Sequence, residues 1–514
     1  MTGRQNGPMR LAGVRQRMIA TDAGVLALCA LSVLALHTIT NGQYGYHRDE
    51  LATLDDARFL SWGYVVYPPF TPFIARVALT LFCTSLIGLR FFAALAPAIA
   101  MVLTGLMARE MGGKRTAQLV AAWAAAIAGP AVSSGALFQY VSFDYLWWVL
   151  AAYVMLRLLN SGDQRWWLAL GGAVGLGMMT KYTMAFFLAG IAGGILVTNL
   201  RVLLNKWLWY GASTALLIFL PNLVWQVQHN FISLDFLRFI HVRDVGMGHT
   251  DNFLLSQGWV ATNVVTVPLW VAGLYFLFAT PDGKRYRVIG WMYVIPLALF
   301  FIAKGKPYYL APAYPMLLAA GAVWGERRLG TLRPTVASAI RRGVRTSLVI
   351  GGLAAGAVVL PLAPPGSQWW RVANAANGSN FDEEFGWREM VEGVARVRDS
   401  LPTESAPVGI LAGDAGQAGA IHIYGHSRGL PEAISGSNTH WLRGYGHSPP
   451  PTVITTGLLR AEVEGIFERC RLAGHFTVPF GIRNSAIGDR TDIFVCQSPR
   501  EPWPLLWKRI RSFG

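Results

Sequence analysis

The chain has 514 residues, of which 53% are hydrophobic and 14% are charged, and its mean hydropathy is +0.38. This composition excludes an ordinary soluble domain and indicates an integral membrane protein. The net charge of +16 lies entirely in residues 1–363, because acidic and basic residues balance in residues 364–514. Basic residues dispersed among apolar segments indicate membrane topology and contact with anionic lipids, and they exclude nucleic acid as a partner.

Apolar stretches follow one another along the chain, each close to the ~20 residues that cross a hydrocarbon core of ~30 Å. The eleven stretches are residues 18–39, 86–108, 117–137, 143–159, 166–180, 182–200, 207–227, 257–279, 287–303, 308–325 and 344–363. The basic tail, residues 1–17, is predicted to lie in the cytoplasm, since positive charge marks the inner side of a membrane. An odd number of spans then places the C-terminal part outside, and we expect a multi-pass protein of the bacterial inner membrane.

The segments predicted outside the membrane are two loops, residues 40–85 and 228–256, and the C-terminal residues 364–514. In the C-terminal part, short apolar runs at 407–412, 452–456 and 492–496 alternate with amphipathic runs at 387–400 and 459–471. Such alternation is typical of a small α/β domain. The predicted fold is therefore mainly α, with a transmembrane domain at 18–363 and an extracytoplasmic α/β domain at 364–514.

Two cysteines of the C-terminal part, Cys470 and Cys496, would share an oxidising compartment if this topology is right. We predict a disulfide between them, and the alternative is two buried thiols. Two histidines, His422 and His426, have the i,i+4 spacing of a helix, and we expect a surface pair rather than a metal site.

Carboxylates gather at the predicted outer surface. Asp49 and Glu50 follow the first span, and Asp144 lies at the outer end of a later one. Charge at a membrane surface is costly unless it is paired or used. The simpler interpretation is that the first two acids begin a helix, whose dipole favours them, and that Asp144 caps another.

Three lysines also fall on the outer side, against the positive-inside pattern: Lys181, Lys304 and Lys306. Each requires an anionic partner, which is either a protein carboxylate or a lipid phosphate.

Several of these segments together resemble the polytopic C-type (GT-C) glycosyltransferases, which include protein O-mannosyltransferases and the lipid A aminoarabinose transferase. The likeness covers most of residues 20–325. The motifs are HRDEL at 47–51, YPP at 67–69, the turn at Asp144, TKYT at 180–183 and KGKPYYLAPAYPMLLAAGA at 304–322. The resemblance implies an extracytoplasmic active site that takes sugar from a polyprenyl-phosphate carrier.

The resemblance also implies residue roles. Asp49, with Glu50 beside it, matches the catalytic acid/base position, and Asp144 resembles the second acidic position. The residues implied to bind the donor phosphate are Arg48, Tyr67, Lys181, Lys304, Lys306 and Tyr309. Tyr67 stands where the aminoarabinose transferase has a lysine, so either Arg48 and Lys181 take over part of the contact or the phosphate lies differently.

The expected reaction is an inverting displacement with a lipid, a polymer or a protein as acceptor. We predict no cofactor; a divalent cation bridging the carboxylates is possible but not favoured. The competing function is a lipid-linked sugar transporter or a glycan-binding membrane scaffold. In transporters, charged residues lie in mid-span beside broken helices, whereas here they cluster at one face, which favours the transferase.

Overall fold

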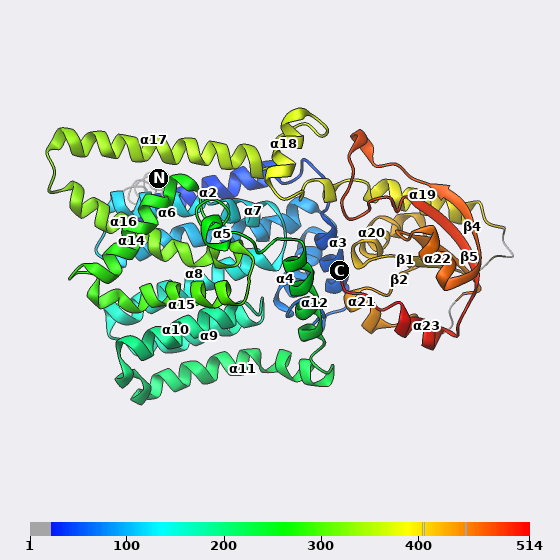
Figure 1. Ribbon diagram of the computed structural model, residues 1–514, viewed down its shortest axis with the longest axis horizontal. Helices are drawn as coiled ribbons and strands as arrows, with labels where there is room; N and C mark the ends of the chain where they lie inside the picture. The colour runs from blue at the N-terminus through cyan, green and yellow to red at the C-terminus, as the bar shows by residue number, and fades with distance from the viewer. Residues whose placement is uncertain (1–21, 403–404, 406, 448–449) are drawn as a thin grey trace, which may run out of the picture.

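The computed structural model describes residues 22–402, 405, 407–447 and 450–514. Figure 1 shows a helical part joined to a smaller part that carries the sheet. The predicted cytoplasmic tail, residues 1–17, and the first residues of the first apolar stretch lie outside the described residues.

Within the described residues, six helices are long and apolar enough to cross a membrane. They are α2 (Asp22–Thr40), α5 (Leu86–Glu110), α8 (Tyr140–Ser161), α11 (Lys206–Gln228), α15 (Arg287–Ile302) with the turn η3 (Lys284–Tyr286), and α17 (Pro334–Val359). The pair α6 (Arg115–Ala126) and α7 (Gly129–Ala136), bent by 63°, would make a seventh. Several of these helices run side by side along the long axis of Figure 1.

Other parts of the chain form shorter apolar helices, and the number of eleven spans stays a prediction. Four shorter apolar segments are α4 (Phe70–Phe82), α9 (Trp166–Met178), α10 (Met184–Thr198) and Val264–Ala279, which combines η2 (Val264–Thr266) with α14 (Val267–Ala279). The stretch 308–325 divides into η4 (Pro307–Ala313) and α16 (Tyr314–Leu329). At 1.5 Å per residue, a helix of 13 residues is about 20 Å long, shorter than the ~30 Å core.

Helices of the membrane part pack through small residues and stacked rings. A Cβ at Gly273 of α14 would lie 2.1 Å from the Leu317 carbonyl oxygen, and one at Gly321 of α16 would lie 1.8 Å from that of Leu269. The two backbones are therefore in direct contact, as small residues permit in membrane helices. Nearby, the rings of Trp148 and Phe187 stack with centroids 4.3 Å apart.

Three further helices lie at the end of the bundle that faces the sheet (Figure 1): α3 (Arg48–Arg58), α12 (Ile232–Gly246) and α4. A short helix, α13 (Phe253–Ser256), follows α12. Helix α3 is the helix that Asp49 and Glu50 were expected to begin in the loop 40–85, and the loop 228–256 supplies α12 and α13.

The C-terminal part contains one five-stranded sheet of order β2-β1-β3-β5-β4. The strands are β1 (Val408–Ala412), β2 (Ala433–Ser435), β3 (Thr452–Thr456), β4 (Phe467–His475) and β5 (Asp492–Pro499). Strand β1 is parallel to β2 and β3, and β5 is antiparallel to β3 and β4. The helices of the C-terminal part are α18 (Gln368–Ala376), α19 (Trp387–Asp399), α20 (Ala415–Tyr424), α21 (Asn438–Arg443), α22 (Arg460–Ile466) and α23 (Trp503–Arg509).

The amphipathic run predicted at 459–471 is helical only to Ile466, because the chain turns there into the extended strand β4. The C-terminal part docks on α3 through α20. A Cβ at Gly419 would lie 2.3 Å from the Leu51 carbonyl oxygen, and one at Gly416 the same distance from Cγ of Arg48. Only glycine permits this approach of α20 to the helix that carries Asp49.

Cys470 and Cys496 face each other across β4 and β5, and their sulfur atoms are bonded. Cys29 and Cys83 are free thiols. The bond spans a sequence separation of 26 residues, which in the chain-entropy account corresponds to roughly 3 to 4 kcal/mol of stability.

We predict that Cys470 and Cys496 resist alkylation in denatured, unreduced protein and become labelled after reduction. The two free cysteines provide the control, since they react under both conditions. Mass spectrometry of the peptides measures the outcome, and full labelling of both cysteines before reduction would disprove the bond.

Candidate functional site

Helix α3 begins with a reciprocal cap that fixes the residues of the HRDEL motif. His47 Nδ1 accepts a hydrogen bond from the Asp49 backbone N–H at 3.1 Å, and the Glu50 carboxylate accepts one from the His47 backbone N–H at 2.9 Å. This capping box satisfies two N–H groups that a helix start leaves unpaired. It also turns the side chains of Asp49 and Glu50 in different directions.

Glu50 points into the protein, where it pairs with a buried arginine of α5. Its carboxylate accepts from Arg90 Nε and Nη2, both at 2.8 Å, and from the Phe138 backbone N–H at 2.8 Å. Arg90 and Glu50 are both fully buried, and Arg90 Nη2 also contacts Glu384 at 3.0 Å. With its oxygens engaged and no contact with the cavity described below, Glu50 has a structural position. Its catalytic role stays a prediction, and the contacts observed for Glu50 are structural ones.

We predict that Glu50→Ala lowers stability by about 3 to 5 kcal/mol, the cost of leaving a buried charge with one partner removed. The measurement is the Tm of purified protein in detergent. Glu432→Ala is the control, since Glu432 is 64% exposed and its pairing with Arg58 is a surface contact. An unchanged Tm together with lost activity would instead indicate that Glu50 has a catalytic role.

A cavity of about 1290 Å³ lies between the helical part and the C-terminal part. The helical part contributes residues of α3, α8, α12 and the segment 303–309, and the C-terminal part contributes residues of the linker before α19, α20 and α21. The predicted site residues that line it are Arg48, Asp49, Tyr67, Lys181, Lys304, Lys306 and Tyr309. Residues spread over about 260 positions of sequence thus meet in one space.

Asp49 presents its carboxylate to this cavity, with 44% of its side chain exposed. One oxygen accepts a hydrogen bond from Gln139 Nε2 at 2.7 Å, and the other lies 3.5 Å from Arg48 Nε. Burial disfavours the charged form, but the charge of Arg48 and its contact with the carboxylate outweigh burial and lower the pKa of the Asp49 carboxyl. Asp49 is therefore a carboxylate at neutral pH and can accept a proton.

Asp144 does not line the cavity. It is 2% exposed, and its oxygens accept hydrogen bonds from Trp148 Nε1 at 3.1 Å and Thr183 Oγ1 at 3.0 Å. Its charge interacts with that of Lys181, which does line the cavity. The role of Asp144 as a second catalytic acid stays a prediction, and α8 directs this side chain into the helix bundle, where it is buried.

Lys181 is held by aromatic rings. Its Nζ lies 4.4 Å from the ring centroid of Tyr309, 5.3 Å from that of Tyr140 and 5.5 Å from that of Tyr308. Among the described residues, no carboxylate lies within 4.0 Å of this ammonium group. Cation–π contacts stabilise the charge without neutralising it, so Lys181 can bind an anion in the cavity.

The other predicted phosphate ligands are engaged to different degrees. Lys306 forms an ion pair of 2.7 Å with Asp244, which also contacts Arg243 at 3.2 Å. Lys304 is exposed at the cavity, with a left-handed backbone at φ 48°. The Tyr67 hydroxyl donates a hydrogen bond of 2.8 Å to Asp56. The sequence left two partners open for Lys306, a protein carboxylate or a lipid phosphate. The structure shows a protein carboxylate, that of Asp244.

Sequence reasoning missed several residues that line the cavity: Gln139, Tyr140, Arg243, Asp244, Tyr308, Glu383, Asp414 and His440. Tyr308 lies within the recognised KGKPYY motif, and Arg243 and Asp244 are adjacent charges in an outer loop, so a signal existed for these three. Nothing in the sequence connects Glu383, Asp414 or His440 with α3.

The far end of α3 joins the C-terminal part through a buried charge cluster. Asp55 contacts His422 Nδ1, His440 Nε2 at 2.9 Å and Arg443, which also binds Asp56. Burial opposes the Asp55 charge, but hydrogen bonds from both histidines hold the pKa of Asp55 well below its usual range. His422 therefore joins the C-terminal part to α3 through Asp55. The expectation that it forms a surface pair with His426 is wrong, because its side chain is 4% exposed. Within the described residues, no group of three or more His, Cys, Asp or Glu side chains could hold a metal ion.

Comparison with solved structures identifies the fold. ArnT from Cupriavidus metallidurans, bound to undecaprenyl phosphate, superposes with a TM-score of 0.57 over 92% of this chain and 97% of that one, at 14% identity. The chain has the fold of the GT-C glycosyltransferases. Residues 66–225 of this chain also match the dolichyl-phosphate-mannose-protein mannosyltransferase family model, and the predicted resemblance is confirmed.

Curated relatives of this chain are glycosyltransferases by name. An undecaprenyl phosphate-α-4-amino-4-deoxy-L-arabinose arabinosyl transferase of Sodalis glossinidius is 29% identical over 216 residues, which is 38% of either chain. The lipid A galacturonosyltransferase RgtD of Rhizobium johnstonii is 23% identical over 330 residues, 60% of this chain and 65% of that protein. This chain thus spans well under two thirds of the first of these relatives and just under two thirds of the second.

Proposed function

We propose that this chain transfers a sugar from a polyprenyl-phosphate carrier to an acceptor hydroxyl, with inversion, on the outer side of a bacterial inner membrane. One observation carries the proposal: a single cavity presents the Asp49 carboxylate and the Lys181 ammonium together. A carboxylate suits an incoming hydroxyl, and an ammonium suits a departing phosphate. The names of the relatives, which include undecaprenyl phosphate donors, support the same class of reaction.

The proposal includes the topology inferred from charge. Eleven spans, a cytoplasmic N-terminus and an extracytoplasmic C-terminal domain from residue 364 would place the cavity at the outer membrane surface, where the head group of a lipid-linked donor lies. The side chains near Lys181 are suited to that surface, because tyrosines are typical of membrane interfaces.

In the proposed step, the bond between the anomeric carbon and the carrier phosphate oxygen breaks as the acceptor oxygen forms its bond to the same carbon. The acceptor proton passes to Asp49, a contribution of ~100 to 10,000-fold in rate. The electron pair of the broken bond stays with the phosphate, whose growing charge Lys181 and Lys304 stabilise. A single in-line displacement inverts the anomeric centre because no covalent carboxyl intermediate forms.

Arg243 adds a third positive charge to those of Lys181 and Lys304 in the cavity. It lines the cavity from α12, and its charge acts on Asp49. The sugar would therefore lie between Asp49 and the cationic group formed by Lys181, Lys304 and Arg243. Hexosyl and pentosyl groups both suit a cavity of this size, and the acceptor is a lipid, a polymer or a protein.

We predict that Asp49→Asn abolishes transfer, because the amide keeps the size of the side chain and cannot accept the proton. The measurement is radiolabelled sugar transfer from a panel of polyprenyl-phosphate sugars to membrane extracts, with Tm as a check of folding. Asp235→Asn is the matched control, since Asp235 is 52% exposed on α12 and does not line the cavity. Substantial turnover by Asp49→Asn, or donor movement without a glycosylated product, would exclude the proposed chemistry.

We predict that Lys181→Met raises the donor KM more than Lys306→Met does, because Lys306 is already neutralised by Asp244 and Lys181 is not. Loss of one charge-assisted contact corresponds to about 1.5 to 3 kcal/mol, or roughly 10 to 150-fold in donor affinity. Lys284→Met, an exposed lysine outside the cavity, serves as the control. Equal effects in the three variants would assign no phosphate contact to Lys181.

A further inference from the structure

The linker η5 (Asp382–Glu384), between α18 and α19, contacts the start of α3. A Cβ at Gly45 would lie 2.3 Å from the Glu384 carbonyl oxygen, so the two backbones touch. The side chain of Glu384 continues inward to Arg90. The neighbouring residue, Glu383, instead lines the cavity.

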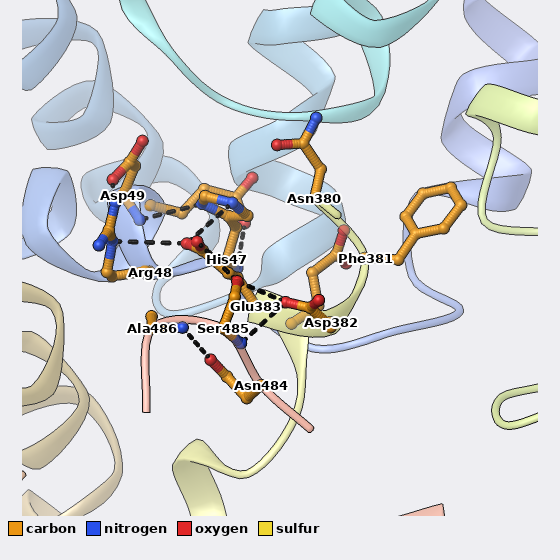
Figure 2. Close-up of polar contacts among 12 residues, drawn as sticks. His47, Arg48, Asp49, Asn380, Phe381, Asp382, Glu383, Asn484, Ser485 and Ala486 are labelled. Carbon is orange, nitrogen blue, oxygen red and sulfur yellow. Dashed lines mark hydrogen bonds and ion pairs between the residues drawn. The ribbon is translucent and has the colours of Figure 1, made fainter. Parts of the chain in front are cut away.

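Glu383 is fixed through its main chain and its side chain. Its carbonyl oxygen accepts a hydrogen bond of 2.7 Å from the indole of buried Trp387, and Oε1 accepts one of 3.2 Å from Ser485 Oγ. Its other oxygen, Oε2, lies 3.3 Å from His47 Nε2 and 3.4 Å from Arg48 Nε. Figure 2 shows this carboxylate between the segment at Ser485 and the first residues of α3.

The tautomer of His47 follows from its cap. Since Nδ1 accepts the Asp49 backbone N–H, the ring proton lies on Nε2 and faces Glu383. His47 is therefore not free to act as a base. Arg48 is shared in turn, because its Nε lies 3.4 Å from Glu383 Oε2 and 3.5 Å from Asp49 Oδ1.

We propose that Glu383 is a positioning residue, which holds Arg48 between two carboxylates and so sets how readily Asp49 accepts a proton. The linker before α19 would then act on the proposed catalytic carboxylate through Arg48. The kinetic consequence of this inference rests on the proposed transferase function, whereas the effect on Asp49 itself can be measured without any substrate.

The groups that face Asp49 determine the sign of the effect. They are Arg48 and His47 on α3, Arg243 on α12 and Tyr140 on α8, with Asp414 acting on the same guanidinium of Arg48. Removing the charge of Glu383 leaves Asp49 as the nearest carboxylate of Arg48. Glu383→Gln should therefore lower the pKa of Asp49 further, because the guanidinium of Arg48 then acts on Asp49 with one competing carboxylate fewer.

The test measures carbodiimide labelling of Asp49 against pH in the purified full-length protein, by mass spectrometry of its peptide. In Glu383→Gln, the midpoint of labelling moves to lower pH, and in Glu383→Asp, which restores a charge, it returns toward the value of the unchanged protein. Glu392→Gln is the matched control, since Glu392 is 50% exposed on α19 and lies outside the cavity. A midpoint in Glu383→Gln equal to that of Glu392→Gln overturns the inference.

Transfer kinetics provide the second readout. We expect kcat of Glu383→Gln to fall on the order of 10 to 100-fold, with little change in donor KM, because the base weakens and its alignment loosens. A raised KM at constant kcat contradicts a positioning role. If the unchanged protein transfers no sugar from any donor, the proposed function fails, and the labelling midpoints still decide the role of Glu383.

Discussion

The buried guanidinium of Arg90 is the interaction on which the rest of the site depends. It is itself fully buried, and it joins Glu50 of α3, Glu384 of the linker and the carbonyl oxygens of Asn41 and Gly45. Burying such a charge without partners is very costly, so the guanidinium is stable there only when these partners are in place. Helix α5, the start of α3 and the linker are thereby held in one arrangement, and the direction of Asp49 follows from it.

A second constraint fixes the other side of α3. Glycines of α20 bring its backbone against Leu51 and Arg48, and the Asp55 cluster binds α20 and α21 further along the same helix. One helix of 11 residues is therefore held by the membrane part on one side and by the C-terminal part on the other. The cavity at its N-terminal end is formed by both parts.

The sequence allowed the membrane class, the small α/β part and the residues Asp49 and Lys181 to be predicted, because hydropathy and misplaced charge are local signals. The distinction between Asp49 and Glu50 could not be predicted. Adjacent helical residues differ by about 100° in direction, and only the distant Arg90 decides which one is buried. The contacts of Glu383 and His422 were missed for the same reason, since their partners lie more than 300 positions away.

Lys181 contacts aromatic rings, whereas Lys306 of the same cavity is paired with a carboxylate. Tyrosine rings hold Lys181, so no ion pair has to break when an anion arrives or leaves. A phosphate diester carries one negative charge, and the monoester that the proposed transfer would leave carries about 1.5 to 2. A cation supported by neutral rings can follow that increase without exchanging an ion-pair partner.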